Sequence, residues 1–119
     1  MISVESRPQI AVVGIGAGLA VPTFANTVRH LGLGDAVNVD IFEADPAPHS
    51  REQGRGSIAL RAVGGLAVLN ELDLELPVTL PASQFTFTDS DGREVLTVPT
   101  EGDVRTPRST LRDLLLRDV

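Results

Sequence analysis

The residues best placed to do chemistry are three closely spaced glycines. Gly14, Gly16 and Gly18 follow the apolar run 10–13, and a further apolar segment follows them. Glycines let a backbone turn sharply and approach a ligand closely, because they carry no Cβ. The free N–H groups at the start of a following helix favour an anion such as a phosphate. The pattern predicts the first strand, turn and helix of a dinucleotide-binding unit.

The glycine spacing departs from the full G-x-G-x-x-G fingerprint. Counted from Gly14, the third glycine position is Leu19, and counted from Gly16 it is Val21. The second register is preferred, because it leaves Gly32 to end a helix of usual length. In either register an aliphatic residue stands where the helix packs closest to the strand. A glycine-rich turn in another kind of α/β protein is the alternative interpretation.

Glu43 strengthens the nucleotide interpretation. It directly follows a second strand-like segment, 37–42, and lies about 20 residues beyond the glycine motif. Dinucleotide-binding folds place an acidic residue there, where its carboxylate accepts hydrogen bonds from the ribose hydroxyls. The alternative is a solvated charge at the end of a strand.

The elements that must position these residues follow from periodicity and turn residues. We expect strands at 9–13, 37–42 and 57–60, with the first strand buried on both faces in a parallel sheet. We expect helices at 17–31, 62–72 and 108–119. The last is capped by Thr106 with Pro107 in its first turn, and its buried residues are Leu111, Leu114 and Leu115. The first has one apolar face, formed by Leu19, Val21, Phe24, Val28 and Leu31. Alternating segments 84–88 and 93–98 around Asp91-Gly92 predict a β-hairpin. Residues 73–82 are expected to be a connection.

Composition excludes several functions. The chain has 119 residues, enough for one small domain, and a net charge of −6, which argues against nucleic-acid binding. It has no cysteine, and its two histidines are isolated, so we expect no metal site and no catalytic nucleophile. No apolar run approaches a membrane span, and residues 1–9 lack the layout of a signal peptide. We therefore expect a cytoplasmic protein without a membrane partner.

The order of these parts resembles a known family. The chain is similar to the N-terminal part of the single-component flavin-dependent aromatic hydroxylases, which include salicylate and p-hydroxybenzoate hydroxylases and the tetracycline-inactivating monooxygenases. The matching parts cover nearly the whole chain. They are the glycine turn 14–18, the strand end 41–44, the loop 54–60, the helix end 72–74, the hairpin, and the segment 107–116.

The resemblance implies a fold, a cofactor and roles for matching residues. It implies an α/β fold, with a Rossmann-like βαβ unit, a parallel sheet and an antiparallel hairpin. It implies an NAD(P)H-dependent FAD monooxygenase that hydroxylates a small aromatic substrate. Within it Gly14, Gly16 and Gly18 form the turn, and Gly16 and Gly18 face the FAD pyrophosphate. Glu43 holds the adenosine ribose, Arg108 reaches the flavin side, and Arg55 and Gly56 lie in the loop beside the isoalloxazine ring. For both arginines the alternative is a solvated charge.

The chain departs from the family in three respects. The link 33–36 between the first helix and the second strand is a few residues longer than is common. The third glycine is missing, and the family's later cofactor-contacting and substrate-covering segments have no counterpart here. We therefore expect residues 1–119 to be one incomplete FAD- or NAD(P)-binding domain that leaves an apolar sheet face uncovered. Two alternatives remain, a fragment of a nicotinamide-dependent dehydrogenase and a non-catalytic nucleotide-binding fragment.

Overall fold

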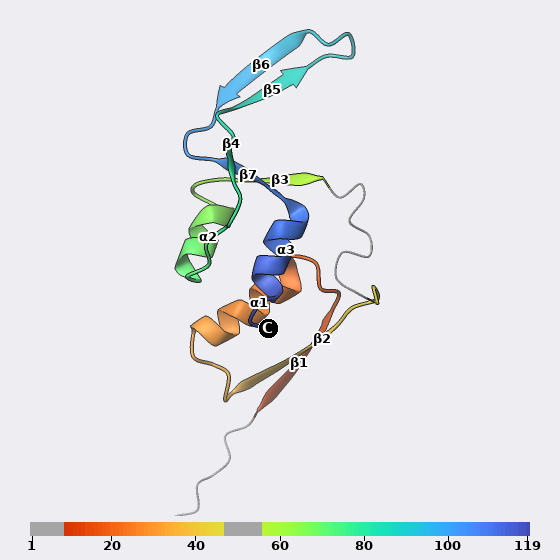
Figure 1. Ribbon diagram of the computed structural model, residues 1–119, viewed down its shortest axis with the longest axis vertical. Helices are drawn as coiled ribbons and strands as arrows, with labels where there is room; N and C mark the ends of the chain where they lie inside the picture. Colours follow the sequence, from red (N-terminus) through yellow and green to blue (C-terminus); the bar gives the residue numbers. More distant parts are fainter. Residues whose placement is uncertain (1–8, 47–55) are drawn as a thin grey trace, which may run out of the picture. The chain divides into compact units, whose positions relative to one another are not determined.

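The computed structural model describes residues 9–46 and 56–119 (Figure 1). The chain divides into two compact units, Met1–Ser50 with Leu115–Val119, and Arg51–Leu114. The elements in chain order are β1 (Ile10–Ile15), α1 (Ala20–His30), β2 (Val37–Phe42), β3 (Ser57–Leu60), α2 (Gly65–Glu71), β4 (Leu80–Pro81), β5 (Gln84–Thr88), β6 (Glu94–Pro99), β7 (Val104–Pro107) and α3 (Arg108–Leu116).

The first unit contains the predicted βαβ arrangement. Strands β1 and β2 pair in parallel, from Ile10 opposite Val37 to Ile15 opposite Phe42, and α1 connects them (Figure 1). In the second unit β5 and β6 form an antiparallel hairpin. The mixed α/β class and both of these motifs are thus confirmed.

The parallel sheet is covered on one face within the described residues. Gly14 faces α1 and is buried, and alternation along the strand places Val12 on the same side. On the opposite face Val13 is 60% exposed, Ile15 77% and Phe42 60%. The expectation that the first strand is buried on both faces is wrong for the part of the chain that the structure describes, where β1 has one neighbouring strand. The uncovered apolar face is the feature predicted for a partial sheet.

Helix α1 is shorter than predicted, and its buried side matches the expected apolar face only at Val28. It starts at Ala20 instead of Ala17, so residues 16–19 belong to the turn, and it ends before Gly32, which has a φ of +69°. Phe24 and Leu31, expected on the buried face, are 44% and 62% exposed. The reason is a buried polar residue, Asn26, which turns its side of the helix toward the end of α3.

The second unit holds a three-stranded antiparallel sheet in the order β3, β7, β4. Two of its strands, β4 and β7, lie in segments that were expected to be a connection and a helix cap. They are two and four residues long, too short to show a periodic pattern. Thr106 is accordingly a strand residue and not an N-cap.

Helices α2 and α3 also start or end inside their predicted ranges. The expected helix 62–72 begins at Gly65, because residues 62–64 form a turn in which the N–H of Gly64 donates to the carbonyl of Arg61 at 3.1 Å. The expected helix 108–119 ends at Leu116. Its three predicted core leucines are buried, as the sequence indicated: Leu111, Leu114 and Leu115.

The buried hydroxyl of Thr106 should stabilise the second unit. Thr106 is 1% exposed, and its Oγ1 donates a hydrogen bond to the carbonyl of Val78 at 2.7 Å. Thr106→Val keeps the shape but leaves that carbonyl without its partner. We expect the free energy of unfolding to fall by about 1 kcal/mol, measured by urea denaturation. Thr106→Ser retains the donor and serves as the control for the loss of the methyl group; an unchanged stability of Thr106→Val would show that the hydrogen bond does not contribute.

Candidate functional site

The turn after β1 is shaped by a close contact between Gly14 and Val21. A Cβ on Gly14 would lie 2.3 Å from Cγ1 of Val21, which is closer than two carbon atoms can approach. Val21 is the position at which the fingerprint would have its third glycine. The missing glycine is thus compensated on the other side of the contact, because the strand rather than the helix contributes the residue without a side chain.

Gly16 holds the turn in a conformation that other residues rarely adopt. Its φ is +91°, and a Cβ on it or on Gly18 would meet nothing within 4 Å. Its N–H donates to the carbonyl of Phe42 at 2.6 Å, which extends the β1–β2 pairing by one residue. The turn therefore presents open space beside Gly16 and Gly18, into which a ligand can approach the backbone.

Glu43 lies beside this turn, at the end of β2. One carboxylate oxygen, Oε2, accepts a hydrogen bond from the backbone N–H of Ala17, and the other, Oε1, accepts one from the N–H of Asp45 at 3.0 Å. The side chain is exposed. A carboxylate oxygen can accept more than one hydrogen bond, so the geometry leaves Glu43 able to bind hydroxyl groups.

The glycine turn and Glu43 therefore form one constellation within the first unit. It combines open backbone, N–H groups and a carboxylate, which are the groups that bind a diphosphate and a ribose. The residues present fit the nucleotide part of FAD.

In the second unit, Gly56 and Arg108 lie together. The N–H of Arg108 donates to the carbonyl of Gly56 at 3.1 Å, next to the pairing of Ser57 with Pro107. Arg108 is exposed at the first position of α3, and Gly56 has a φ of +61°. Arg55 lies outside the described residues. The roles of these three residues beside a flavin stay predictions.

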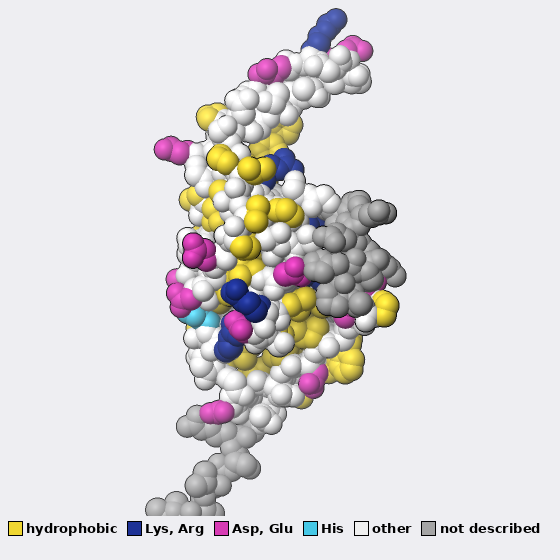
Figure 2. Space-filling view, in the orientation of Figure 1, with side chains coloured by type: hydrophobic (Ala, Val, Ile, Leu, Met, Phe, Trp, Pro, Cys, Tyr) yellow, Lys and Arg dark blue, Asp and Glu magenta, His cyan; other side chains and the backbone are white. Residues whose placement is uncertain are grey.

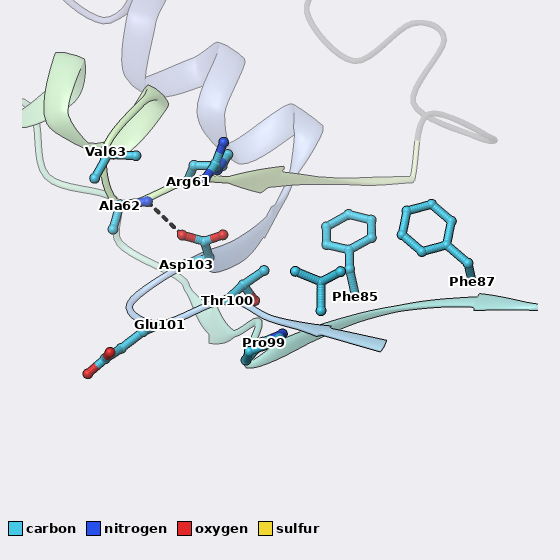
Figure 3. Close-up of a pocket in the computed structure, with 10 residues that line it drawn as sticks. Arg61, Ala62, Val63, Phe85, Phe87, Pro99, Thr100, Glu101 and Asp103 are labelled. Atoms are coloured by element: carbon cyan, nitrogen blue, oxygen red, sulfur yellow. Dashed lines mark hydrogen bonds between the residues drawn. The ribbon is translucent and has the colours of Figure 1, made fainter. Parts of the chain in front are cut away.

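A separate hollow of about 430 Å³ lies at the base of the hairpin (Figure 3). Phe85 and Phe87 line one side, with ring centroids 6.3 Å apart, and the Ala62–Asp103 hydrogen bond lies on the other. Both rings are about half exposed, and Figure 2 shows hydrophobic side chains at the surface in this region. The hollow has the size of a small-molecule pocket and can accept an apolar group.

Two other kinds of site concern metal ions and membranes, and the following holds for residues 9–46 and 56–119. No group of three or more potential metal-ligating side chains occurs among them. None of the helices in these ranges is long and apolar enough to cross a membrane.

Sequence reasoning missed the groups that hold Glu43. Ala17 contributes through its backbone N–H, and a backbone donor leaves no trace in residue type. The one available indication was its place between Gly16 and Gly18, in a turn that had been assigned to the helix. Asp45 contributes in the same way, through the backbone two residues after Glu43.

Comparison with solved structures gives a likeness that extends over most of the chain. No family model matches the chain, and no curated protein matches its sequence. The solved structure of 2,6-dihydroxypyridine-3-hydroxylase from Arthrobacter nicotinovorans is similar, with a TM-score of 0.63 and 25% identity over 94% of this chain. The chain spans 27% of the length of that hydroxylase. The fold is therefore similar to the corresponding part of an enzyme that, by its name, hydroxylates an aromatic ring.

Proposed function

We propose that this chain is the nucleotide-binding part of an FAD-dependent monooxygenase that hydroxylates a small aromatic molecule, with NAD(P)H as reductant. The observation that carries the proposal is the likeness to a ring hydroxylase, which extends over 94% of the chain. The flavin motifs in the sequence support the same assignment independently. As one part of a cofactor-binding domain, the chain supplies binding groups and not the whole reaction site.

FAD, when bound, supplies the electron transfer and oxygen activation that amino-acid side chains cannot perform. The glycine turn with Gly16 and Gly18 binds the diphosphate through backbone N–H groups. Glu43 orients the adenosine by accepting hydrogen bonds from the ribose. Arg108, with Arg55 and Gly56, serves the flavin side. Because FAD supplies the chemistry and the protein supplies binding groups, the proposed function requires no catalytic nucleophile from this chain.

The topology after β2 favours this function over a dehydrogenase. Dinucleotide-binding halves of dehydrogenases continue as further βαβ units with parallel strands. In the described residues of the second unit, β3, β7 and β4 pair antiparallel, and so do β5 and β6. A non-catalytic nucleotide-binding fragment is distinguished by the turnover experiment below.

Loss of the Glu43 carboxylate is expected to weaken FAD binding by about 1–3 kcal/mol, the scale of lost hydrogen bonds to a charged group. The measurement is a titration of Glu43→Ala with FAD, followed by flavin fluorescence. Asp40→Ala is the matched control, because it removes another exposed carboxylate, which lies in β2 three residues before Glu43. The Asp40 carboxylate accepts a hydrogen bond from the amide of Asn38, which is not part of the glycine turn. Equal affinities of the two variants would contradict the assigned role of Glu43.

Residues 1–119 alone are expected to retain FAD weakly and to hydroxylate nothing. The uncovered sheet face favours association. The chain spans 27% of the length of the similar hydroxylase, so we expect the flavin ring to stay open to water. The test is the visible spectrum after desalting, followed by NADH or NADPH with a panel of phenolic acids and dihydroxypyridines. A yellow, monomeric protein that turns over one of them would overturn this expectation. A protein that binds neither FAD nor ADP would overturn the proposed function.

A further inference from the structure

The Glu43 carboxylate occupies a place that an anionic ligand would use. Its Oε2 accepts the N–H of Ala17, the residue between the two glycines of the open turn. A carboxylate on a backbone N–H makes the same charge-assisted hydrogen bond that a phosphate oxygen would make there. The turn therefore already holds an anion that belongs to the chain itself.

The neighbouring N–H group is held differently. Gly16 donates to the carbonyl of Phe42, and this bond is part of the strand pairing, so it cannot open without breaking the end of the sheet. The bond from Ala17 ends on an exposed side chain, whose other carboxylate oxygen accepts a hydrogen bond from the N–H of Asp45. A rotation of this side chain about its χ angles can release the N–H of Ala17 without breaking the β1–β2 pairing. Of these two N–H groups, Ala17 is therefore the one that can be exchanged while the sheet stays intact.

We propose that Glu43 is an exchangeable internal anion of the glycine turn. It releases the N–H of Ala17 when a diphosphate binds there, and its freed oxygen then accepts hydrogen bonds from the ribose of the same nucleotide. The proposal rests on the proposed nucleotide function and adds a coupling between two parts of the ligand. Because one movement of Glu43 serves both parts, binding of diphosphate favours binding of ribose, and the reverse.

The proposal predicts opposite effects of one substitution on two partial ligands. Glu43→Ala should bind inorganic pyrophosphate about fivefold or more tightly than the wild type, because the competing carboxylate is gone. The same variant should bind adenosine and ADP more weakly, because the acceptor for the ribose is gone. A carboxylate that only held the ribose would leave pyrophosphate binding unchanged.

The experiment is a titration of the ¹⁵N-labelled chain with pyrophosphate, adenosine and ADP, read from the amide resonances of Ala17 and Gly18. Asp40→Asn is the control for net charge, since it removes an exposed carboxylate from β2 without touching the turn. Glu43→Gln keeps the size of the side chain and an uncharged acceptor, so its pyrophosphate affinity should lie between those of wild type and Glu43→Ala. This variant also supplies the answer if Glu43→Ala does not fold.

The outcomes separate the two proposals. Tighter pyrophosphate binding by the Glu43 variants than by Asp40→Asn supports the exchange. Equal or weaker pyrophosphate binding overturns it, as does failure of every variant to bind pyrophosphate. If the wild type binds pyrophosphate but neither ADP nor FAD, the nucleotide function fails, while the ranking of the variants still decides whether Glu43 competes for the turn.

Discussion

Asn26→Asp is expected to lower the free energy of unfolding by about 3–5 kcal/mol, the cost of a buried charge without adequate partners. Asn26 is 2% exposed, and its Nδ2 donates to the carbonyl oxygens of Pro22 at 2.8 Å and Leu115 at 2.7 Å. Aspartate offers acceptors alone, so a carboxylate oxygen would face two carbonyl oxygens. The guanidinium of Arg29, which donates to Oδ1 of Asn26 at 2.6 Å, compensates only part of this repulsion.

Urea denaturation followed by circular dichroism measures the effect. Asn70→Asp makes the same chemical change at an exposed position of α2 and should alter stability by less than about 0.5 kcal/mol. A similar small change in Asn26→Asp would show that the bond between α1 and the end of α3 does not contribute to stability.

Gly14→Ala is expected to destabilise the first unit by about 1–3 kcal/mol, as overpacking of a well-filled contact does. The new Cβ would lie 2.3 Å from Cγ1 of Val21, and a valine in a helix has essentially one favourable χ1 rotamer. The strand and the helix must therefore move apart. Elsewhere in a strand the same substitution would be mildly favourable, because glycine loses more conformational freedom on folding.

A double-mutant cycle identifies the contact as the cause. Val21→Ala removes the clashing methyl group, so Gly14→Ala with Val21→Ala should be more stable than the sum of the single effects by about 1 kcal/mol or more. Gly34→Ala is the control, since a Cβ there would meet nothing within 4 Å. Strict additivity of the two changes would show that Gly14 is not required by its neighbour Val21.

The parts of the fold that the sequence predicted are those with a local pattern. The βαβ unit was marked by an apolar run and glycines, and the hairpin by alternation around Asp91-Gly92. Strands β4 and β7 were missed because they are only two and four residues long and pair with residues far along the chain. The buried side of α1 was predicted only in part, because periodicity treats Asn26 as a surface residue, whereas its amide is buried and donates to two carbonyl oxygens.

The candidate site was predicted by residue type but not by contact. Gly16 and Glu43 were named for a diphosphate and a ribose, and the structure places their segments side by side. The sequence did not show that Gly14 lacks a side chain where Val21 packs against the strand. In the fingerprint, the residue without a side chain at this contact is a glycine in the helix. The bond from Ala17 to Glu43 depends on where the helix starts, which sequence patterns determine poorly.

The backbone pairing of the hairpin β5–β6 continues into the pairing of β4 with β7, and this succession indicates an order of folding. From the turn at Asp89 the ladder runs to Gln84 opposite Pro99, and then to Pro81 opposite Val104. The first pairs close only the short hairpin loop, which takes microseconds. Once they have formed, each further pair closes only a short additional loop, so its entropic cost is small.

Strand β3 has no such succession. Its partner β7 lies far along the chain, with Ser57 opposite Pro107. The pairing of β3 with β7 must therefore close the whole chain between them as one long loop, unless the hairpin has already formed and shortened it. Substitutions in the hairpin turn should consequently slow folding, whereas substitutions in β3 should act on the rate of unfolding. We therefore expect the hairpin to form early and to shorten the chain between the distant strands β3 and β7, which stopped-flow folding kinetics of such variants would test.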